Sequence, residues 1–236
     1  MRVLVVEDDP AALREHVRAL RRLGLAVDGE RTVRAGGRAL ADVPYDALVV
    51  RRRLADGDGM ALAHELGDHV AVVVLTSGPV GERLDLLLAG VDDCIAPPVG
   101  TQELALRLGK AMLRRTGSPS RVRIGRVLVD RIRREVSLDG APVALTARQM
   151  CVLDHLVAHR HRVVSLEELL EHCWDERSDM FSNPVPSQIT RLRSKLAGAI
   201  DIVWTGGAGY LLHVVEEEPT SARGEPDACG GTRPWL

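Results

Sequence analysis

The sequence lacks long hydrophobic runs, clustered cysteines and, almost entirely, lysine. No apolar stretch reaches the roughly 20 residues that a membrane-spanning helix needs. The opening residues, MRVLVVEDDP, turn acidic after a short apolar run, which is typical of a buried strand and not of a signal peptide. These absences predict a cytoplasmic protein without a membrane partner.

The cysteines are too scattered to indicate a metal site or a disulfide framework. Cys94, Cys151, Cys173 and Cys229 include no CxxC pair and no Cys/His spacing of the metal-ligand type. We therefore expect reduced thiols, with neither a bound metal ion nor a cofactor.

Charge is nearly balanced and says little about partners. The net charge is −2, and residues 118–215 are only mildly basic, with 13 Lys and Arg against 11 Asp and Glu. Lys110 and Lys195 are the only lysines, so almost every basic side chain is an arginine. The local placement of charge must therefore distinguish between functions.

Hydrophobic periodicity divides the chain into two units. In residues 1–115, near-continuous apolar strands alternate with helical patterns. This predicts an α/β doubly wound five-stranded parallel sheet, with a site at the carboxyl ends of its strands. The expected strands are 26–29, 47–50, 70–75, 93–96 and Arg2–Val6, and the expected helices are 11–22, 33–41, 60–66, 82–89 and Thr101–Arg115.

A polar linker, residues 116–120, separates this unit from a second, α+β unit over residues 121–215. The second unit is expected to contain short antiparallel strands in 122–138, helices over 147–159, Leu166–Cys173 and 185–197, and a hairpin of 202–204 with 210–214. Ser165 and Glu168 have the spacing of a capping box at the second helix. Residues 216–236 are rich in Gly, Pro and charge, which predicts disorder.

Three carboxylates, Glu7, Asp8 and Asp9, directly follow the first strand. Clustered carboxylates at the site end of a sheet suit a hard cation such as magnesium. The alternative is a solvated acidic loop in which Asp9 or Pro10 simply begins the helix.

The first unit resembles the receiver domains of bacterial response regulators. The matching stretches are VLVVEDDP, PYDALVV, LADGDGM, VVVLTSG and GVDDCIAPP, and the similarity covers residues 1–115. In such receivers an aspartate at the end of the third strand accepts a phosphoryl group, assisted by magnesium, a hydroxyl and a lysine. The resemblance implies that Glu7 and Asp8 are the metal-binding acids, Thr76 the switch hydroxyl and Pro98 the proline that follows the lysine.

The departures from the receiver pattern affect the chemistry itself. Arg51 stands at the acceptor position, Pro97 at the lysine position and Cys94 at the switch aromatic position. Arginine has no carboxylate and stays protonated at physiological pH, so we expect no ordinary aspartyl phosphorylation. Asp56 and Asp58 are weak alternative acceptors, because a turn is expected there.

We expect the Arg51 guanidinium to enter the pocket lined by Glu7 and Asp8, where a permanent ion pair would exclude magnesium. The alternative is that Arg51 points into solvent. By resemblance, Asp92 and Asp93 with Arg107 and Arg114 imply symmetric dimerisation through the last helix of the receiver, although exposed charges of this kind are more often solvated than paired.

Residues 122–214 resemble the winged-helix effector domain of OmpR/PhoB-class regulators. The matching stretches are LDGAPVALTARQMCVLDHL, RVVSLEELLEHCW, SNPVPSQITRLRSKL and TGGAGYLL. In the third helix, Ile189, Leu192 and Leu196 form an apolar stripe, and the polar residues lie outside it. A helix fits the major groove of DNA, where arginine reads guanine and glutamine reads adenine.

The resemblance implies a set of DNA-contacting residues in the second unit. Gln188, Arg191 and Arg193 are expected to face the groove with Thr190 beside them, and Lys195 and Ser165 to lie near phosphates. The alternative is an ordinary amphipathic helix with a solvated basic face.

Three further features bear on the DNA-binding unit. Pro184 and Pro186 precede or open the helix, so we expect it to start at Val185 or later. Gly207 replaces the basic residue common in the wing, which removes a DNA contact, so we expect weaker binding that depends on dimerisation or cooperative sites. The acidic segment 174–181 lies where this class contacts RNA polymerase.

We therefore predict a DNA-binding transcriptional regulator, not an enzyme, acting as a homodimer on direct repeats in promoters without aspartyl phosphorylation. The alternative is a regulator whose receiver inhibits DNA binding until a ligand or partner binds. A phosphoryl-transfer enzyme using Asp8 is a third possibility, but no second catalytic group has suitable spacing.

Overall fold

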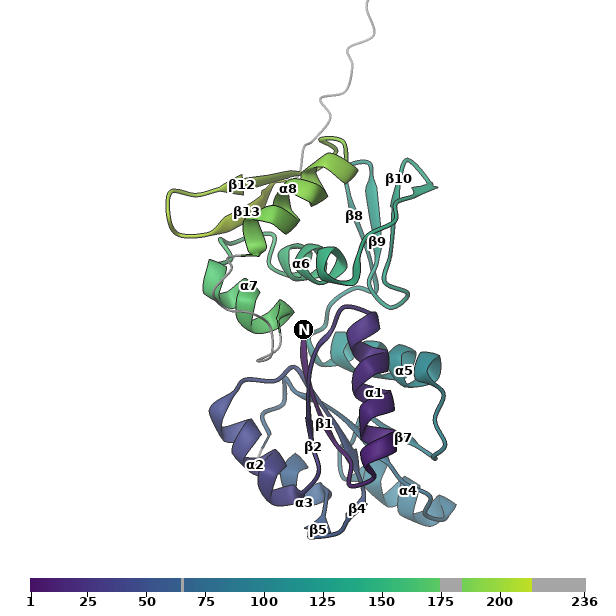
Figure 1. The fold of residues 1–236 in the computed structure, drawn as a ribbon. Coiled ribbons are helices and arrows are strands. Elements are labelled where there is room, and N and C mark those ends of the chain that lie inside the picture. Colours follow the sequence, from purple (N-terminus) through teal and green to yellow (C-terminus); the bar gives the residue numbers. More distant parts are fainter. Residues whose placement is uncertain (65, 175–183, 214–236) are drawn as a thin grey trace, which may run out of the picture.

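The computed structural model describes residues 1–64, 66–174 and 184–213. Two units lie end to end, and the amino terminus lies at their junction (Figure 1). We call them the N-terminal unit, residues 1–115, and the C-terminal unit, which begins at residue 121. Among the described residues, no helix is both long and apolar enough to cross a membrane.

The N-terminal unit is built on one parallel sheet of order β2-β1-β3-β6-β7, which confirms the predicted five-stranded α/β fold. Its strands are β1 (Arg2–Val6), β2 (Ala26–Glu30), β3 (Ala47–Arg51), β6 (Ala71–Leu75) and β7 (Asp93–Ile95). Its helices are α1 (Pro10–Arg22), α2 (Val33–Asp42), α3 (Met60–Ala63), α4 (Val80–Leu88) and α5 (Thr101–Arg115).

Both faces of this sheet are covered, which explains its near-continuous apolar strands. Val3 and Val5 share one core with residues of α1 and α5. Leu4 and Val6 point to the opposite face and share a second core with residues of α2, α3 and α4. The carboxyl ends of the strands lie at the end of the unit away from the junction (Figure 1).

Two details of the N-terminal unit differ from the sequence prediction. The helix expected over 60–66 ends at Ala63, and a small unpredicted ladder joins β4 (Arg53–Leu54) to β5 (Gly57–Asp58). Asp56, between those strands, accepts a hydrogen bond of 2.8 Å from the Val33 main chain at the start of α2. The tertiary contact with α2 therefore orders a segment whose own pattern predicts only a turn.

The C-terminal unit has an antiparallel sheet, a helical bundle and a hairpin, as expected for a winged helix. The sheet has the order β11-β10-β9-β8. Its elements are β8 (Arg121–Ile124), β9 (Val127–Asp130), β10 (Glu135–Leu138), β11 (Ala141–Pro142), α6 (Ala147–Ala158), α7 (Leu166–Cys173), α8 (Val185–Lys195), β12 (Asp201–Trp204) and β13 (Tyr210–His213). The predicted disordered tail, 216–236, lies outside the described residues.

The predicted capping box at α7 is only half formed. The Ser165 hydroxyl accepts a hydrogen bond of 3.0 Å from the Glu168 main chain, but the Glu168 carboxylate turns instead to His155 and to Arg162. A complete capping box occurs at α6, where Thr146 and Gln149 bond reciprocally. The prediction was wrong for α7 because groups outside the helix bind the carboxylate more strongly than its own cap does.

The two units make direct contact at the junction. The main-chain nitrogen of Met1 lies 3.1 Å from the carbonyl oxygen of His172 in α7. Gly24, with φ of +84°, packs against Ala147, where a side chain at position 24 would meet the Ala147 carbonyl oxygen at 2.1 Å. Only glycine meets both demands at that point, so the loop after α1 is shaped to fit the C-terminal unit.

Candidate functional site

Helix α8 presents a polar face on the C-terminal unit. Ile189, Leu192 and Leu196 are buried, which confirms the predicted apolar stripe, and Val185 is buried as well. Thr190, Arg191 and Ser194 are exposed on the other side, and Gln188 is half-buried. In the part of the chain that the structure describes, no hydrogen bond or ion pair involves the exposed Arg191 guanidinium.

Two predicted DNA-contacting residues of α8 are engaged inside the protein. Arg193 donates two hydrogen bonds to the Ile202 carbonyl oxygen, one of them 2.9 Å long from Nε, and so joins α8 to β12. Lys195 donates to the Ala144 carbonyl oxygen at 2.6 Å and to the Gln149 side chain at 2.9 Å. In this arrangement both side chains hold α8 on the rest of its unit.

Two further segments border the region expected to contact DNA: the start of α8 and the loop between β12 and β13. α8 begins at Val185 with Pro186 in its first turn, where the missing N–H would have no helical partner anyway. The loop of the β12–β13 hairpin contains Gly206, Gly207 and Gly209, all with positive φ. It therefore offers main chain, and no basic side chain, to a partner. Most of the segment expected to contact RNA polymerase falls within 175–183, outside the described residues.

At the carboxyl ends of β1 and β3, Arg51 forms ion pairs with both first-strand acids. Arg51 Nη1 lies 3.0 Å from Glu7 Oε1, and Arg51 Nε lies 3.7 Å from Asp8 Oδ1. Glu7 is 1% exposed, whereas Arg51 is 36% exposed. Burial raises the pKa of Glu7, and the hydrogen bond from the Asp9 main chain and the charge of Arg51 oppose that shift. Asp9 itself caps α1.

The remaining predicted pocket residues lie around a cavity of about 400 Å³ beside this ion pair. Thr76 is buried and donates a hydrogen bond of 2.8 Å to Glu82 of α4. Pro97 lines the cavity, and the Pro97–Pro98 peptide bond is cis. Three consecutive arginines, Arg51 to Arg53, line the cavity, and each forms an ion pair with a carboxylate.

The charged residues predicted to form a dimer interface are paired within the chain. Arg107 contacts Asp93 at 3.1 Å and Glu103 at 2.8 Å. Asp92 is held by Arg115 at 2.9 Å, while Arg114 reaches only its carbonyl oxygen. Arg115 was not among the predicted residues, because helical spacing does not reveal which arginine faces the preceding strand.

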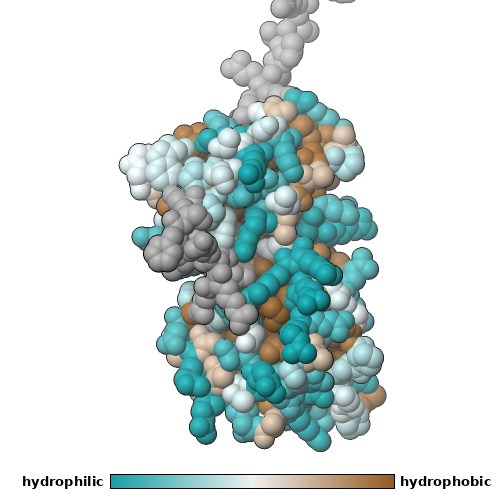
Figure 2. Space-filling view, in the orientation of Figure 1, coloured by the Kyte–Doolittle hydropathy of each residue, from teal (hydrophilic) through white to brown (hydrophobic). Residues whose placement is uncertain are grey.

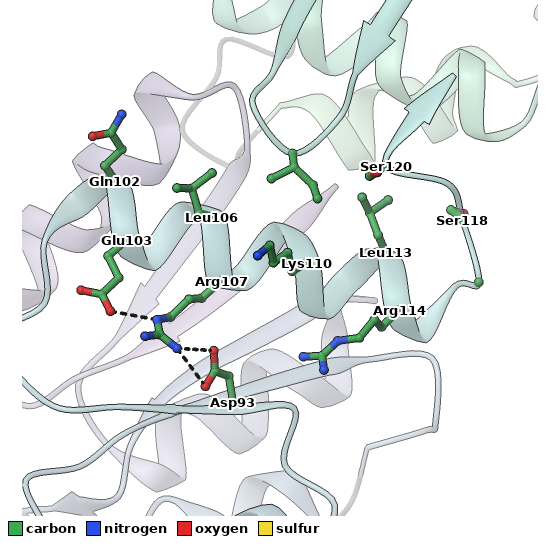
Figure 3. Close-up of a pocket in the computed structure, with 12 residues that line it drawn as sticks. Asp93, Gln102, Glu103, Leu106, Arg107, Lys110, Leu113, Arg114, Ser118 and Ser120 are labelled. Atoms are coloured by element: carbon green, nitrogen blue, oxygen red, sulfur yellow. Dashed lines mark hydrogen bonds and ion pairs between the residues drawn. The ribbon is translucent and has the colours of Figure 1, made fainter. Parts of the chain in front are cut away.

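A groove of about 1050 Å³ runs along α5 to the segment 117–120 and Ile132 of the C-terminal unit. Leu106 and Leu113 project from one side of α5, and Arg107 and Arg114 from the other (Figure 3). In the space-filling view, hydrophobic patches lie among hydrophilic ones where the two units meet (Figure 2). The face of α5 thus combines apolar and charged side chains.

Comparison with known proteins identifies the class. Residues 140–212 match the family model described as transcriptional regulatory protein, C terminal. CutR of Streptomyces coelicolor, a transcriptional regulatory protein, is 38% identical over 90% of this chain and 100% of its own length. QseB of Escherichia coli O157:H7, also a transcriptional regulatory protein, is 33% identical over 90% of this chain and 99% of its own length.

Among solved structures, the response regulator DrrB, an OmpR/PhoB homologue from Thermotoga maritima, matches with a TM-score of 0.40 and 23% identity, over 89% of this chain and 97% of its own. The receiver-like unit and the winged helix define a DNA-binding response regulator of transcription. The chain belongs to the OmpR/PhoB-type family of transcriptional regulators.

Proposed function

We propose that this regulator binds its promoter sites without aspartyl phosphorylation. The observation that carries the proposal is Arg51, which ends β3 and pairs with Glu7 and Asp8. An arginine offers no carboxylate to a phosphoryl donor. Pro97, at the position of the expected lysine, offers no ammonium group to a phosphate.

The same ion pairs support exclusion of magnesium from the pocket. A divalent cation would need the Glu7 and Asp8 oxygens that Arg51 now contacts at 3.0 and 3.7 Å. Displacing a guanidinium at the end of a central strand would leave two positive groups side by side. Arg51 therefore acts as a built-in counter-ion for the two acids.

Arg191 is the leading candidate for direct reading of a base, with Thr190 and Gln188 beside it on α8. It is exposed and unpaired among the described residues, and its planar fork suits guanine in the major groove. We assign Arg193 and Lys195 mainly to positioning α8, since both bond to carbonyl oxygens. We keep Ser165, whose hydroxyl caps α7, as a candidate phosphate contact.

Dimerisation through the α4–β7–α5 face would compensate for a wing without basic side chains. Val80, Leu84, Leu87 and Leu88 form an exposed apolar stripe along α4, with Leu88 87% exposed. Such a stripe on a folded surface marks an interaction site more often than an isolated leucine does. We propose a homodimer on direct repeats, in which Asp92, Asp93, Arg107 and Arg114 flank the apolar contact.

The basic cavity beside Arg51 favours a second candidate function. Its 400 Å³ volume and its arginine wall would accept a small anionic ligand or an acidic partner segment. In that case the receiver-like unit would inhibit DNA binding until the ligand or partner arrives.

Selection from random duplexes with the purified, unmodified chain tests the main proposal. We expect a direct-repeat site whose affinity falls steeply with salt, as phosphate contacts require. Treatment with acetyl phosphate and magnesium should change neither the intact mass nor the affinity. A phosphorylated product that binds more tightly would contradict the proposal. Failure to select any site would favour the inhibited, ligand-controlled alternative.

A matched pair of variants tests the base contact. Arg191→Ala should cost about 1–3 kcal/mol in binding the selected site and relax the preference at one base pair. Arg123→Ala, which removes another exposed arginine from β8, serves as the control. Equal losses for both variants would mean that Arg191 contributes only general charge.

A further inference from the structure

A cluster of histidine and glutamate side chains lies where α6 ends and α7 begins. His155 is in the last turn of α6, His159 caps its carboxyl end, and Glu168 is in the first turn of α7. His155 Nε2 lies 2.7 Å from Glu168 Oε1, and His159 Nε2 lies 3.9 Å from the same oxygen. One ligand-type atom from each residue lies within 4.8 Å of the others.

These three groups are the ligand set of a zinc-type site. Two imidazole nitrogens and one carboxylate oxygen, with a fourth position open to water, are typical of tetrahedral zinc coordination. Bonds of about 2.0–2.2 Å place neighbouring ligands of such an ion roughly 3.4 Å apart. The distances from Glu168 Oε1 to the two histidine nitrogens, 2.7 and 3.9 Å, lie on either side of that value. Small side-chain rotations would therefore bring the groups to coordinating distances. Imidazole ligands also favour zinc-like ions over magnesium.

Burial disfavours a positive charge on both histidines of the cluster. His155 is 5% exposed, and burial lowers its pKa to about 3. Burial also lowers the pKa of His159. Because a carboxylate only accepts hydrogen bonds, His155 Nε2 carries the proton of its 2.7 Å contact with Glu168, and that proton must move to Nδ1 before Nε2 can bind an ion.

An arginine holds the carboxylate in the absence of an ion. Arg162 donates to both oxygens of Glu168, at 2.7 and 2.6 Å. It lies on the connection between α6 and α7, and its side chain is 49% exposed. It can therefore leave for solvent when a cation takes its place, at little cost in desolvation.

The surroundings connect the cluster to the junction of the two units. The His172 ring packs against His155 with 4.6 Å between ring centroids, and its Nδ1 lies 3.0 Å from the Glu168 carbonyl oxygen. The His172 carbonyl oxygen in turn lies 3.1 Å from the Met1 nitrogen. An ion at this point would pin α6 to α7 beside the contact with the N-terminal unit.

We propose that His155, His159 and Glu168 form a binding site for a divalent transition-metal ion of the zinc type, and that Arg162 releases Glu168 when the ion binds. Binding of the ion would make the α6–α7 pair, which supports α8, more rigid. The site makes the regulator a metal-responsive one, independently of how its promoter sites are chosen.

Titration of zinc into the chelator-treated full chain, monitored by calorimetry, tests the site. We expect one saturable ion per chain, with no comparable binding of magnesium. His159→Gln should weaken zinc binding by at least about 100-fold, since even loss of an outer-shell group costs 10- to 100-fold. His161→Gln, which changes an exposed histidine on the same connection, is the control and should bind as the unaltered chain does.

A second variant has an effect of opposite sign. Arg162→Gln removes the competitor for Glu168 and should tighten zinc binding, by roughly two- to fivefold for an exposed ion pair. Circular dichroism of each zinc-free variant checks that it is folded. Absence of saturable zinc binding, or equal zinc affinity in the unaltered chain and the folded His159→Gln variant, would overturn the proposal. Unchanged affinity in a folded Arg162→Gln variant would overturn the exchange with Arg162.

Discussion

The two units of this regulator each contain an arginine that occupies a place where a cation could bind. In the N-terminal unit Arg51 pairs with Glu7 and Asp8, and in the C-terminal unit Arg162 pairs with Glu168. Arg51 belongs to a central strand, whereas Arg162 lies on a connection between helices. The two arginines are similarly exposed, at 36% and 49%.

The carboxylates differ much more than the arginines do. Glu7 is 1% exposed and Glu168 20%. A carboxylate as buried as Glu7 depends on its counter-ion, because water cannot replace it. Glu168 has partial access to water and a second partner in His155. An arginine therefore closes a cation site more firmly where its carboxylate has little access to water.

The largest expected effect comes from removing the arginine of the buried pair. Arg51→Ala should lower the free energy of unfolding by about 3–5 kcal/mol, because it leaves the Glu7 charge buried and unpaired. Urea denaturation measures the change. Arg53→Ala is the control, since Arg53 is 86% exposed and should change stability by less than about 0.5 kcal/mol. If both variants lowered the free energy of unfolding by the same small amount, Arg51 would be a solvated side chain.

The second-largest effect is expected from added metal ions, which should distinguish the Arg51 site from the Arg162 site. Zinc at about 100 times its dissociation constant should stabilise the chain by about 2.7 kcal/mol, whereas magnesium should leave the melting temperature unchanged. His159→Gln should abolish the zinc effect and His161→Gln should preserve it. A magnesium effect on the unaltered chain would show that Arg51 does not close its pocket.

A smaller effect is expected from neutralising the buried carboxylate. The pKa of Glu7 is raised in the folded state, so its protonated form is favoured on folding, and that contribution is lost as the pH rises through the raised pKa. Glu7→Gln removes this dependence. The variant should gain stability relative to the unaltered chain above the ordinary pKa of 4.5, and the gap should close at lower pH. Denaturation at a series of pH values would detect the trend, and a gap independent of pH would contradict it.

The smallest effect should come from the exposed arginine. In zinc-free protein, Arg162→Ala should cost only about 0.5 kcal/mol, because Glu168 keeps His155 and water as partners. Thermal melting in the presence of a chelator measures it beside Arg51→Ala. Equal costs for the two variants would remove the proposed difference between the sites.

Much of the fold followed from local patterns. Arg2–Val6, Thr101–Arg115 and Leu166–Cys173 were predicted to the residue, since uninterrupted apolar strands and amphipathic periods report burial directly. The helix expected over 185–197 ends at Lys195, because Ala197 has a φ of +47°. Helix ends are decided by single residues and are therefore the least predictable part of a pattern.

The candidate sites were predictable in part. The sequence shows that Arg51 ends a strand. The first and third strands pair side by side, and this pairing brings Arg51 next to the acids that follow the first strand. The histidine pair was missed, although His155 and His159 are four residues apart on a helical pattern and so share a face. Their carboxylate partner, Glu168, lies on the next helix, and no local pattern brings it to the histidines.

By itself, the sequence determined the two-unit architecture, the family and the presence of an arginine, Arg51, at the end of the third strand of the receiver-like unit. Those features depend on hydrophobic period, on motif order and on residue identity, all of which are local. Only the tertiary structure decided that Glu168 turns away from its helix cap to His155 and Arg162, and that Arg193 and Lys195 bond to carbonyl oxygens. The partners of a side chain come from elements distant in sequence, and packing alone selects among them.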